Sequence, residues 1–144
     1  MVGEEHFMRE HRLNLCAILC AFFCVFLIQT GFSQGSPELE VKDPGICANI
    51  ESLTCIDSKE EFSPEVEKLY CFTRINGAQE DTEVTHVWYY GEIERARISL
   101  PVRSASYRTY SSKRIQPHEV GDWHVDVLGP DEKVLKTISF KIVQ

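Results

Sequence analysis

An all-β fold is predicted for the greater part of this chain: an immunoglobulin-like sandwich of two sheets with about seven antiparallel strands. Two observations predict it. After residue 44 no segment keeps the 3.6-residue period of a helix, and short runs rich in β-branched and aromatic residues alternate with turn-forming stretches such as "NGAQED" and "LGPDEK". The runs expected to form strands are residues 45–51, 68–75, 83–90, 93–102, 106–114, 122–128 and 133–143.

The connection between the first two expected strands is polar, and only its end suggests local structure. There the stretch "FSPEVEKL" is expected to form one helical turn, with Pro64 at its start. Residues 45–144 are expected to make up one domain, because the roughly 110 residues that follow the predicted signal peptide leave no room for two.

Residues 1–33 are expected to be a secretory signal peptide. Arg9 and Arg12 precede an apolar run from Leu15 to Ile28, and the small-residue stretch "GFSQGS" follows it. That run is shorter than the roughly 20 residues that a membrane-spanning helix needs. Cleavage is expected after Ser33 or Gly35, and the alternative is an uncleaved anchor formed by residues 13–32. Either way the domain is expected to be exported, to the periplasm or cell envelope, behind a flexible spacer at residues 34–44.

The charge of the chain argues against a general nucleic-acid binder. The 144 residues carry a net charge of −7, and after Ser33 there remain 13 basic and 19 acidic residues. The average conceals an asymmetry, because the stretch from Arg95 to Arg114 contains six basic residues and no acid. Membrane contact is expected only through an uncleaved N-terminal segment.

Three cysteines follow the predicted signal peptide, and export makes a disulfide plausible. Cys47 and Cys71 each lie within a strand-like run, whereas Cys55 lies in a polar connection. We therefore predict a Cys47–Cys71 disulfide with Cys55 free; the alternative is three unpaired thiols.

The stretch "THVWYYGE" is expected to lie in a hairpin that turns at Gly91-Glu92, where a type II′ turn favours glycine first. In that register Trp88 lies opposite Arg95, and His86 lies opposite Arg97. Side chains alternate between the faces of a strand, which gives a core face of Thr85, Val87, Tyr89, Ala96, Ile98 and Leu100. The other face would be exposed, because unpaired arginines do not enter cores. The alternative is that Trp88 is the buried tryptophan of a sandwich.

Basic and aromatic residues on the exposed face, and in "YRTYSSK" that follows, suit an anionic or sugar-like ligand. Arginine makes paired hydrogen bonds with carboxylate or phosphate, and aromatic rings stack on ligands and cations. The candidate ligand-binding residues are His86, Trp88, Tyr90, Arg95, Arg97, Arg108, Tyr110 and Lys113. The alternative is that these basic residues pair with the acids of the rest of the domain.

No catalytic or metal-binding pattern is found in the sequence. G-x-S-x-G, H-E-x-x-H, C-x-x-C and a glycine-rich phosphate loop are all missing from it. No enzyme activity, cofactor or metal is therefore expected. Trp123, in the alternating stretch "GDWHVDV", is expected to be a core residue.

The segments "LYCFTRINGAQEDTEVTHVWYYGEIERARISLPVRSASYRTYSSKRI" and "GDWHVDVLGPDEKVLKTISF" together resemble the bacterial domain of unknown function DUF2914. The family pattern has H-x-W, a glycine, an S/L-P stretch, W/Y-R-T-W/Y-S-S/R-K and G-x-W-x-V-x-V before a final strand. It maps onto His86, Trp88, Gly91, Leu100, Pro101, Tyr107 to Lys113, Gly121, Trp123, Val125, Val127 and Phe140. The resemblance covers about residues 45–142. Tyr107 and Tyr110 stand where the family commonly has tryptophan, and Cys55 is unlike the family.

The resemblance implies an envelope-associated β-domain, and it implies no activity. The function expected from the sequence is a non-catalytic binding or adaptor module for an anionic glycan or lipid or for an envelope protein. A purely structural domain is the second interpretation. A hydrolase of envelope polymers is the third, which lacks a paired-carboxylate or nucleophile motif.

Overall fold

The computed structural model describes residues 38–144, and the predicted signal peptide lies outside this range. The described chain forms nine strands and one short 3-10 helix, and it contains no α-helix. The elements are β1 (Glu40–Glu51), β2 (Thr54–Ser58), β3 (Glu61–Phe62), the 3-10 helix (Pro64–Val66), β4 (Lys68–Asn76), β5 (Thr82–Tyr90), β6 (Ile93–Val102), β7 (Ser106–Arg114), β8 (Gly121–Leu128) and β9 (Val134–Ile142).

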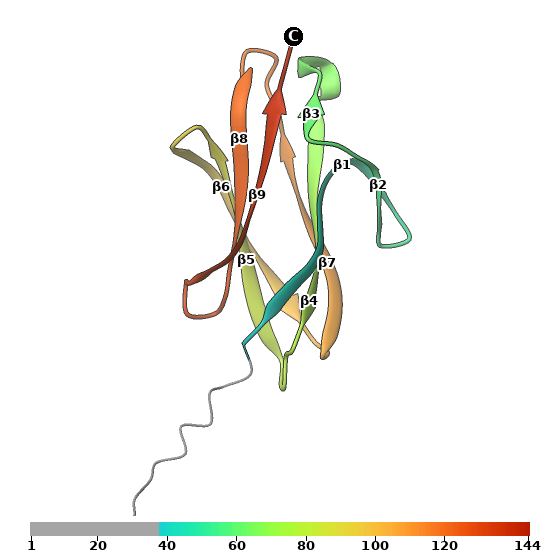
Figure 1. Cartoon of the computed structure of the whole chain (residues 1–144), viewed down its shortest axis with the longest axis vertical. Coiled ribbons are helices and arrows are strands. Elements are labelled where there is room, and N and C mark those ends of the chain that lie inside the picture. The colour runs from blue at the N-terminus through green and yellow to red at the C-terminus, as the bar shows by residue number, and fades with distance from the viewer. Residues whose placement is uncertain (1–37) are drawn as a thin grey trace, which may run out of the picture. The chain divides into compact units, whose positions relative to one another are not determined.

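The strands form two sheets that lie against each other (Figure 1). The four-stranded sheet has the order β2-β1-β4-β7, and the five-stranded sheet has the order β3-β9-β8-β5-β6. Every pairing is antiparallel except that of the two-residue β3 with β9. The predicted all-β, two-sheet architecture is therefore confirmed.

The expected strands are close to the observed ones, with differences at the N-terminal side. β1 begins at Glu40, so residues 40–44 belong to a strand and not to the expected spacer. The connection after β1 contains β2 and β3, which were not predicted, because their polar residues carry no alternating apolar signal. The helical turn at Pro64 is observed as a 3-10 helix, where the Ser63 hydroxyl accepts a hydrogen bond from the Glu65 amide (3.2 Å).

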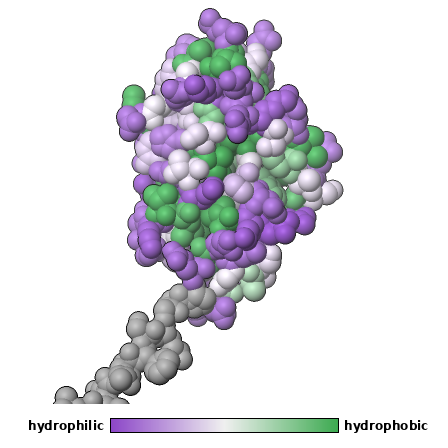
Figure 2. All heavy atoms as spheres, in the orientation of Figure 1, coloured by the Kyte–Doolittle hydropathy of each residue, from purple (hydrophilic) through white to green (hydrophobic). Residues whose placement is uncertain are grey.

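The core lies between the sheets and has two clusters of buried residues. The larger contains Trp88, Trp123, Leu69, Cys71 and Phe140, and Trp88 and Trp123 each lie about 6 Å from the Phe140 ring. The smaller is built around Ile75, Val84, Val102 and Val127. Trp123 is a core residue, as predicted. Outside the core, polar residues cover much of the face seen in Figure 2, with apolar atoms in small areas between them.

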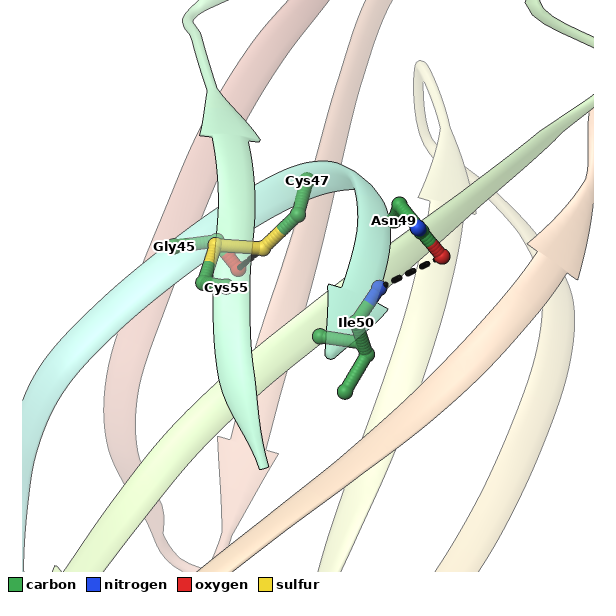
Figure 3. The surroundings of a disulfide bond; sticks show 5 residues. All are labelled: Gly45, Cys47, Asn49, Ile50 and Cys55. Carbon is green, nitrogen blue, oxygen red and sulfur yellow. Dashed lines mark hydrogen bonds between the residues drawn. A yellow bond between two sulfur atoms is a disulfide. The ribbon is translucent and has the colours of Figure 1, made fainter. Parts of the chain in front are cut away.

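The disulfide joins Cys47 to Cys55, not to Cys71 (Figure 3). Cys71 pairs across the strands with Ile46, and both lie in the core cluster. The next residue, Cys47, therefore points away from the core, to the opposite face of the sheet from Cys71. The predicted pairing was wrong for this reason, and the unpaired thiol among the described residues is Cys71, which is buried.

The disulfide holds the hairpin of β1 and β2 close to the outer face of the four-stranded sheet. A side chain at Gly45 would place its Cβ 3.0 Å from the Ser58 hydroxyl oxygen and 3.1 Å from the Cys55 sulfur. Glycine at this position thus lets β2 approach β1. Two residues, Ser52 and Leu53, form the hairpin turn, and both have positive φ (47° and 53°).

We predict that Cys71 is unreactive in the folded protein. Its thiol is buried, and burial raises its pKa well above the ordinary value, so that almost no reactive thiolate is present at neutral pH. Iodoacetamide labelling followed by peptide mass spectrometry without reduction should show a Cys47–Cys55 linked peptide and an unlabelled Cys71. Labelling should appear after denaturation in urea. Rapid labelling of Cys71 in the native protein would contradict its burial.

Candidate functional site

The β5–β6 hairpin turns where the sequence predicts, but its register differs from the prediction. Gly91 has φ of 57°, Glu92 has no positive φ, and Tyr90 pairs with Ile93, as expected for the turn. A bulge then follows, and beyond it Trp88 pairs with Ala96 and not with Arg95. One extra residue on β6, Arg95, shifts the remaining pairs by one position, so that His86 pairs with Ile98.

The bulge turns the predicted exposed face of β5 into the core face. His86 and Trp88 are both fully buried, so they cannot belong to an exposed ligand-binding face, and the prediction for these two residues was wrong. Ala96, Ile98 and Leu100 of β6 do pack against the core, as predicted. Of the predicted core residues of β5, Val87 is fully buried and Thr85 is also buried, although alternation places both on the other face of the strand from Trp88. Tyr89 is only half-buried, and its ring stacks on that of His124 at 4.6 Å.

His86 lies in a closed hydrogen-bonded cluster that connects the two sheets. Its Nδ1 lies 2.8 Å from the Ser111 hydroxyl, and its Nε2 lies 3.2 Å from the Thr73 hydroxyl. The indole of Trp88 donates to the same Ser111 oxygen at 3.0 Å. The polar atoms of a buried histidine are thus satisfied by side chains of β4 and β7, which gives His86 a structural role.

We predict that His86 makes the stability of the domain depend on pH. Burial lowers its pKa from 6.5 to about 4, so the folded state keeps the ring neutral while the unfolded chain binds a proton below pH 6.5. The stabilisation is complete above pH 6.5 and is lost as the pH falls to about 4, with a total of about 3 kcal/mol. Urea unfolding across this range should show a steeper loss for the native chain than for His86→Gln. Equal slopes would contradict the neutral, buried ring.

The other predicted residues of the hairpin make internal contacts. Arg95 pairs with the buried carboxylate of Glu119, and the Tyr90 hydroxyl donates to the Val120 carbonyl at 2.7 Å. Arg97 pairs with Glu94 at 3.1 Å and with Glu132 at 2.9 Å. For Arg95 and Arg97 the interpretation of pairing with the domain's own acids therefore describes the structure better than ligand binding.

Arg108 and Tyr110, by contrast, lie on an exposed surface, the outer face of the four-stranded sheet. Lys113 points to the other side of β7, where it is half-buried and its Nζ donates to the Arg114 carbonyl at 2.5 Å. The predicted site is thus divided among the core, the five-stranded sheet and the two sides of β7. We call the outer face the basic face, and it is made of Lys42, Lys68, Tyr70, Phe72, Arg74, Arg108, Tyr110, Ser112 and Arg114.

A row of three cations crosses the basic face. Arg74 on β4 pairs in register with Lys42 on β1 on one side and with Arg108 on β7 on the other. Lys42 contacts Glu40 at 2.6 Å and Arg74 contacts Asp43 at 2.8 Å, whereas Arg108 makes no ion pair with any described residue. The Nε of Arg74 is buried without a hydrogen-bond partner among residues 38–144. Like charges directly opposite each other destabilise a sheet, and a bound anion would remove this repulsion.

A second cation pair and two tyrosines lie further along the same strands. Lys68 pairs in register with Arg114, and neither makes an ion pair within the described part of the chain. Between the two cation pairs the Tyr70 and Tyr110 rings make an edge-to-face contact at 6.0 Å, and the Lys68 ammonium lies 5.5 Å from the Tyr70 ring centre. Tyr110 is 40% exposed and is therefore available for stacking.

The turn of the β1–β2 hairpin borders the cation row of Lys42, Arg74 and Arg108 on one side. Leu53, which is 48% exposed, lines a hollow of about 230 Å³ with Asp43, Phe72, Arg74 and Arg108. It also lines a second hollow of about 400 Å³ along residues 106–110 of β7. The two hollows share Leu53 and Arg108. A leucine with positive φ in an exposed position is a strained choice, and such outliers concentrate at functional surfaces.

Sequence reasoning missed the β1 and β4 half of this surface. A usable signal was present in "KLYCFTRIN", where alternate positions place Lys68, Tyr70, Phe72 and Arg74 on one face of a strand. Lys42 and Asp43 could not be assigned, because their residues were interpreted as spacer. Leu53 enters the site only through the disulfide-linked hairpin.

Within residues 38–144, no group of three or more histidine, cysteine or acidic side chains is placed to hold a metal ion. The described part of the chain also contains no helix long and apolar enough to cross a membrane. The largest fully buried polar side chains, His86 and Glu119, both have structural partners.

Residues 81–142 match the model of a family described as "Protein of unknown function (DUF2914)". The resemblance seen in the sequence is confirmed over this range, which includes β5 to β9; residues 45–80 lie outside the match. No curated protein matches the chain. Arg108, Tyr110 and Arg114 of the basic face thus lie within the family segment, whereas Lys42, Lys68 and Arg74 come from the strands before it.

Proposed function

We propose that this chain, whose residues 81–142 belong to the DUF2914 family, is a non-catalytic binding module that takes an anionic ligand on its basic face. The observation that carries the proposal is the cation row of Lys42, Arg74 and Arg108 in a chain with a net charge of −7. A chain rich in acids could separate these cations or pair each of them. Arg108 is instead left without an acidic partner among the described residues.

The chemistry of the face favours carboxylate or phosphate groups on a partly apolar ligand. Guanidinium groups make paired, charge-assisted hydrogen bonds with such anions, and the guanidinium of Arg108 is exposed for this purpose. Tyr110 and Leu53 add exposed apolar surface beside the cations. A purely structural domain is the second candidate, and the internal ion pairs of Arg95 and Arg97 favour it for the other sheet.

The setting of this activity is also part of the proposal. We infer that the domain is exported and acts in the periplasm or cell envelope, as its signal-peptide-like N-terminus and its Cys47–Cys55 disulfide support. An immunoglobulin-like strand arrangement is our proposal for the sandwich, supported by its two sheets of short, mostly antiparallel strands. An envelope glycan, lipid headgroup or acidic protein would each supply the anionic groups.

Reversal of charge at Arg108 should weaken anion binding without unfolding the domain. Dextran sulfate is a suitable probe, with uncharged dextran for comparison, and Arg108→Glu should lower its affinity by about tenfold or more, since two charge units change at the end of the cation row that has no acidic partner among the described residues. The matched control is Lys136→Glu, an equal charge change at an exposed position of β9 in the five-stranded sheet. If Arg108→Glu and Lys136→Glu bind dextran sulfate with equal affinity and have equal urea midpoints, the domain is purely structural and the proposed site is wrong.

A further inference from the structure

The two cation pairs of the basic face are arranged for a ligand longer than a single anion. Arg74 and Lys68 are six residues apart on β4, and Arg108 and Arg114 are six residues apart on β7. At about 3.4 Å per residue, the pairs lie roughly 20 Å apart along the strands. A lone carboxylate or phosphate can contact only one pair, so one ligand that uses both must be extended.

The surface between the pairs carries rings and a hydroxyl but no charge. It consists of Tyr70, Phe72, Tyr110 and Ser112, of which Phe72 is nearly covered. Flat ring faces that can be stacked, with hydroxyl groups at their edges, match this stretch better than a continuous line of phosphates, because a line of phosphates would pass over the tyrosines without a cation to neutralise it. Sugar rings that carry carboxylates have this combination of apolar faces, hydroxyls and separated charges.

The hairpin turn favours a ligand that runs along the strands. Leu53 stands beside Arg74 and Arg108 on the β1 side, and the hollow of about 400 Å³ opens on its other side along β7. The Cys47–Cys55 disulfide fixes the hairpin at this place (Figure 3). A chain bound at Arg108 is thus kept from crossing β1 and is left to follow β7, whose exposed positions continue through Tyr110 and Ser112 to Arg114.

We propose that the basic face binds a linear acidic saccharide along β4 and β7, with carboxylates at the Arg74/Arg108 and Lys68/Arg114 pairs and a sugar ring over Tyr110. This inference rests on the proposed anion-binding function and adds the ligand class, its direction and its minimum length. Leu53 is assigned as a contact that limits the ligand on the β1 side.

The test is a length series of oligogalacturonates, from one to eight sugar units, measured by isothermal titration calorimetry. Affinity should rise by about tenfold or more once the chain spans both cation pairs and should then level off, since each tenfold gain corresponds to about 1.4 kcal/mol. Lys68→Glu and Arg114→Glu should remove the gain of the octamer but leave the binding of the monomer unchanged. Arg108→Glu should weaken both, and Lys136→Glu should change neither.

The variant Leu53→Gly tests whether Leu53 contacts the ligand, apart from any effect of Leu53 on the stability of the domain. Glycine adopts positive φ without strain, so this variant should keep the urea midpoint of the native chain or exceed it, while it lowers octamer affinity. A lower midpoint together with unchanged octamer affinity would remove Leu53 from the site.

Different failures point to different conclusions. Binding that depends on Arg108 but not on length would overturn the extended saccharide and keep the anion site. Tighter binding of octathymidylate or of phosphatidylglycerol vesicles than of the octamer would replace the saccharide with a nucleic acid or a membrane. A lack of binding by every anionic probe would overturn both the inference and the proposed function.

Discussion

Replacement of Trp88 by alanine is expected to lower the free energy of unfolding by about 3–5 kcal/mol, the usual cost of removing a large buried side chain. Trp88 is fully buried, its ring lies 6.1 Å from that of Phe140, and its indole donates to Ser111. The variant loses this packing and also one partner of the polar cluster around His86. Urea midpoints measured at neutral pH give the result.

Two variants calibrate the effect of Trp88→Ala. Trp123→Ala belongs to the same class, because Trp123 is buried and its indole donates to the Glu119 carbonyl at 3.0 Å. Tyr110→Ala removes an aromatic ring that is 40% exposed and should cost much less. A midpoint for Trp88→Ala close to that of Tyr110→Ala would place Trp88 on the surface and would contradict the β6 bulge.

The fold class could be predicted from the sequence because it depends on local pattern. β5 to β9 begin and end within about two residues of the expected strands, since β-branched runs and turn residues mark them directly. β2 is a polar strand that exists because β1 and the Cys47–Cys55 disulfide hold it in place. Its signal lies in a contact with another part of the chain and not in its own residues.

The register of the β5–β6 hairpin could not be predicted from alternation. A bulge adds one residue to one strand, and every side chain beyond it changes face relative to the partner. The predicted exclusion of arginine from the core was correct, but Arg95 satisfies it by occupying the bulge, while Trp88 enters the core. The extra residue, Arg95, pairs with a carboxylate 24 residues further along the chain, a contact that the residues of the hairpin alone do not reveal.

The candidate site was predicted in part for a related reason. Arg108 and Tyr110 were found through the concentration of basic residues, which is visible in the sequence as a run. Arg74 became a member of the site only when β4 was paired with β7. A face built from neighbouring strands depends on strand order, and strand order is not a local property.

The ion pair between Arg95 and Glu119 should be the most costly charge contact to break in the domain. Glu119 is fully buried, and its Oε2 accepts a hydrogen bond from the Gln116 amide at 2.8 Å while its Oε1 faces Arg95. Arg95→Ala leaves a buried carboxylate without its cation and should lower the free energy of unfolding by about 3 kcal/mol. Arg97→Ala is the control, because its acidic partners are exposed and such pairs contribute about 1 kcal/mol or less.

The double variant Arg95→Met with Glu119→Gln tests whether the loss comes from the stranded charge. Glutamine can still accept the hydrogen bond from the Gln116 amide, and methionine keeps much of the apolar stem of the arginine, so no charge remains buried. The double variant should therefore recover most of the stability lost by Arg95→Ala. If instead it is as unstable as Arg95→Ala, then packing of the Arg95 stem, and not charge, holds the bulge in its register. Equal unfolding free energies for Arg95→Ala and Arg97→Ala would show that Glu119 reaches solvent, and the bulge would then need another cause.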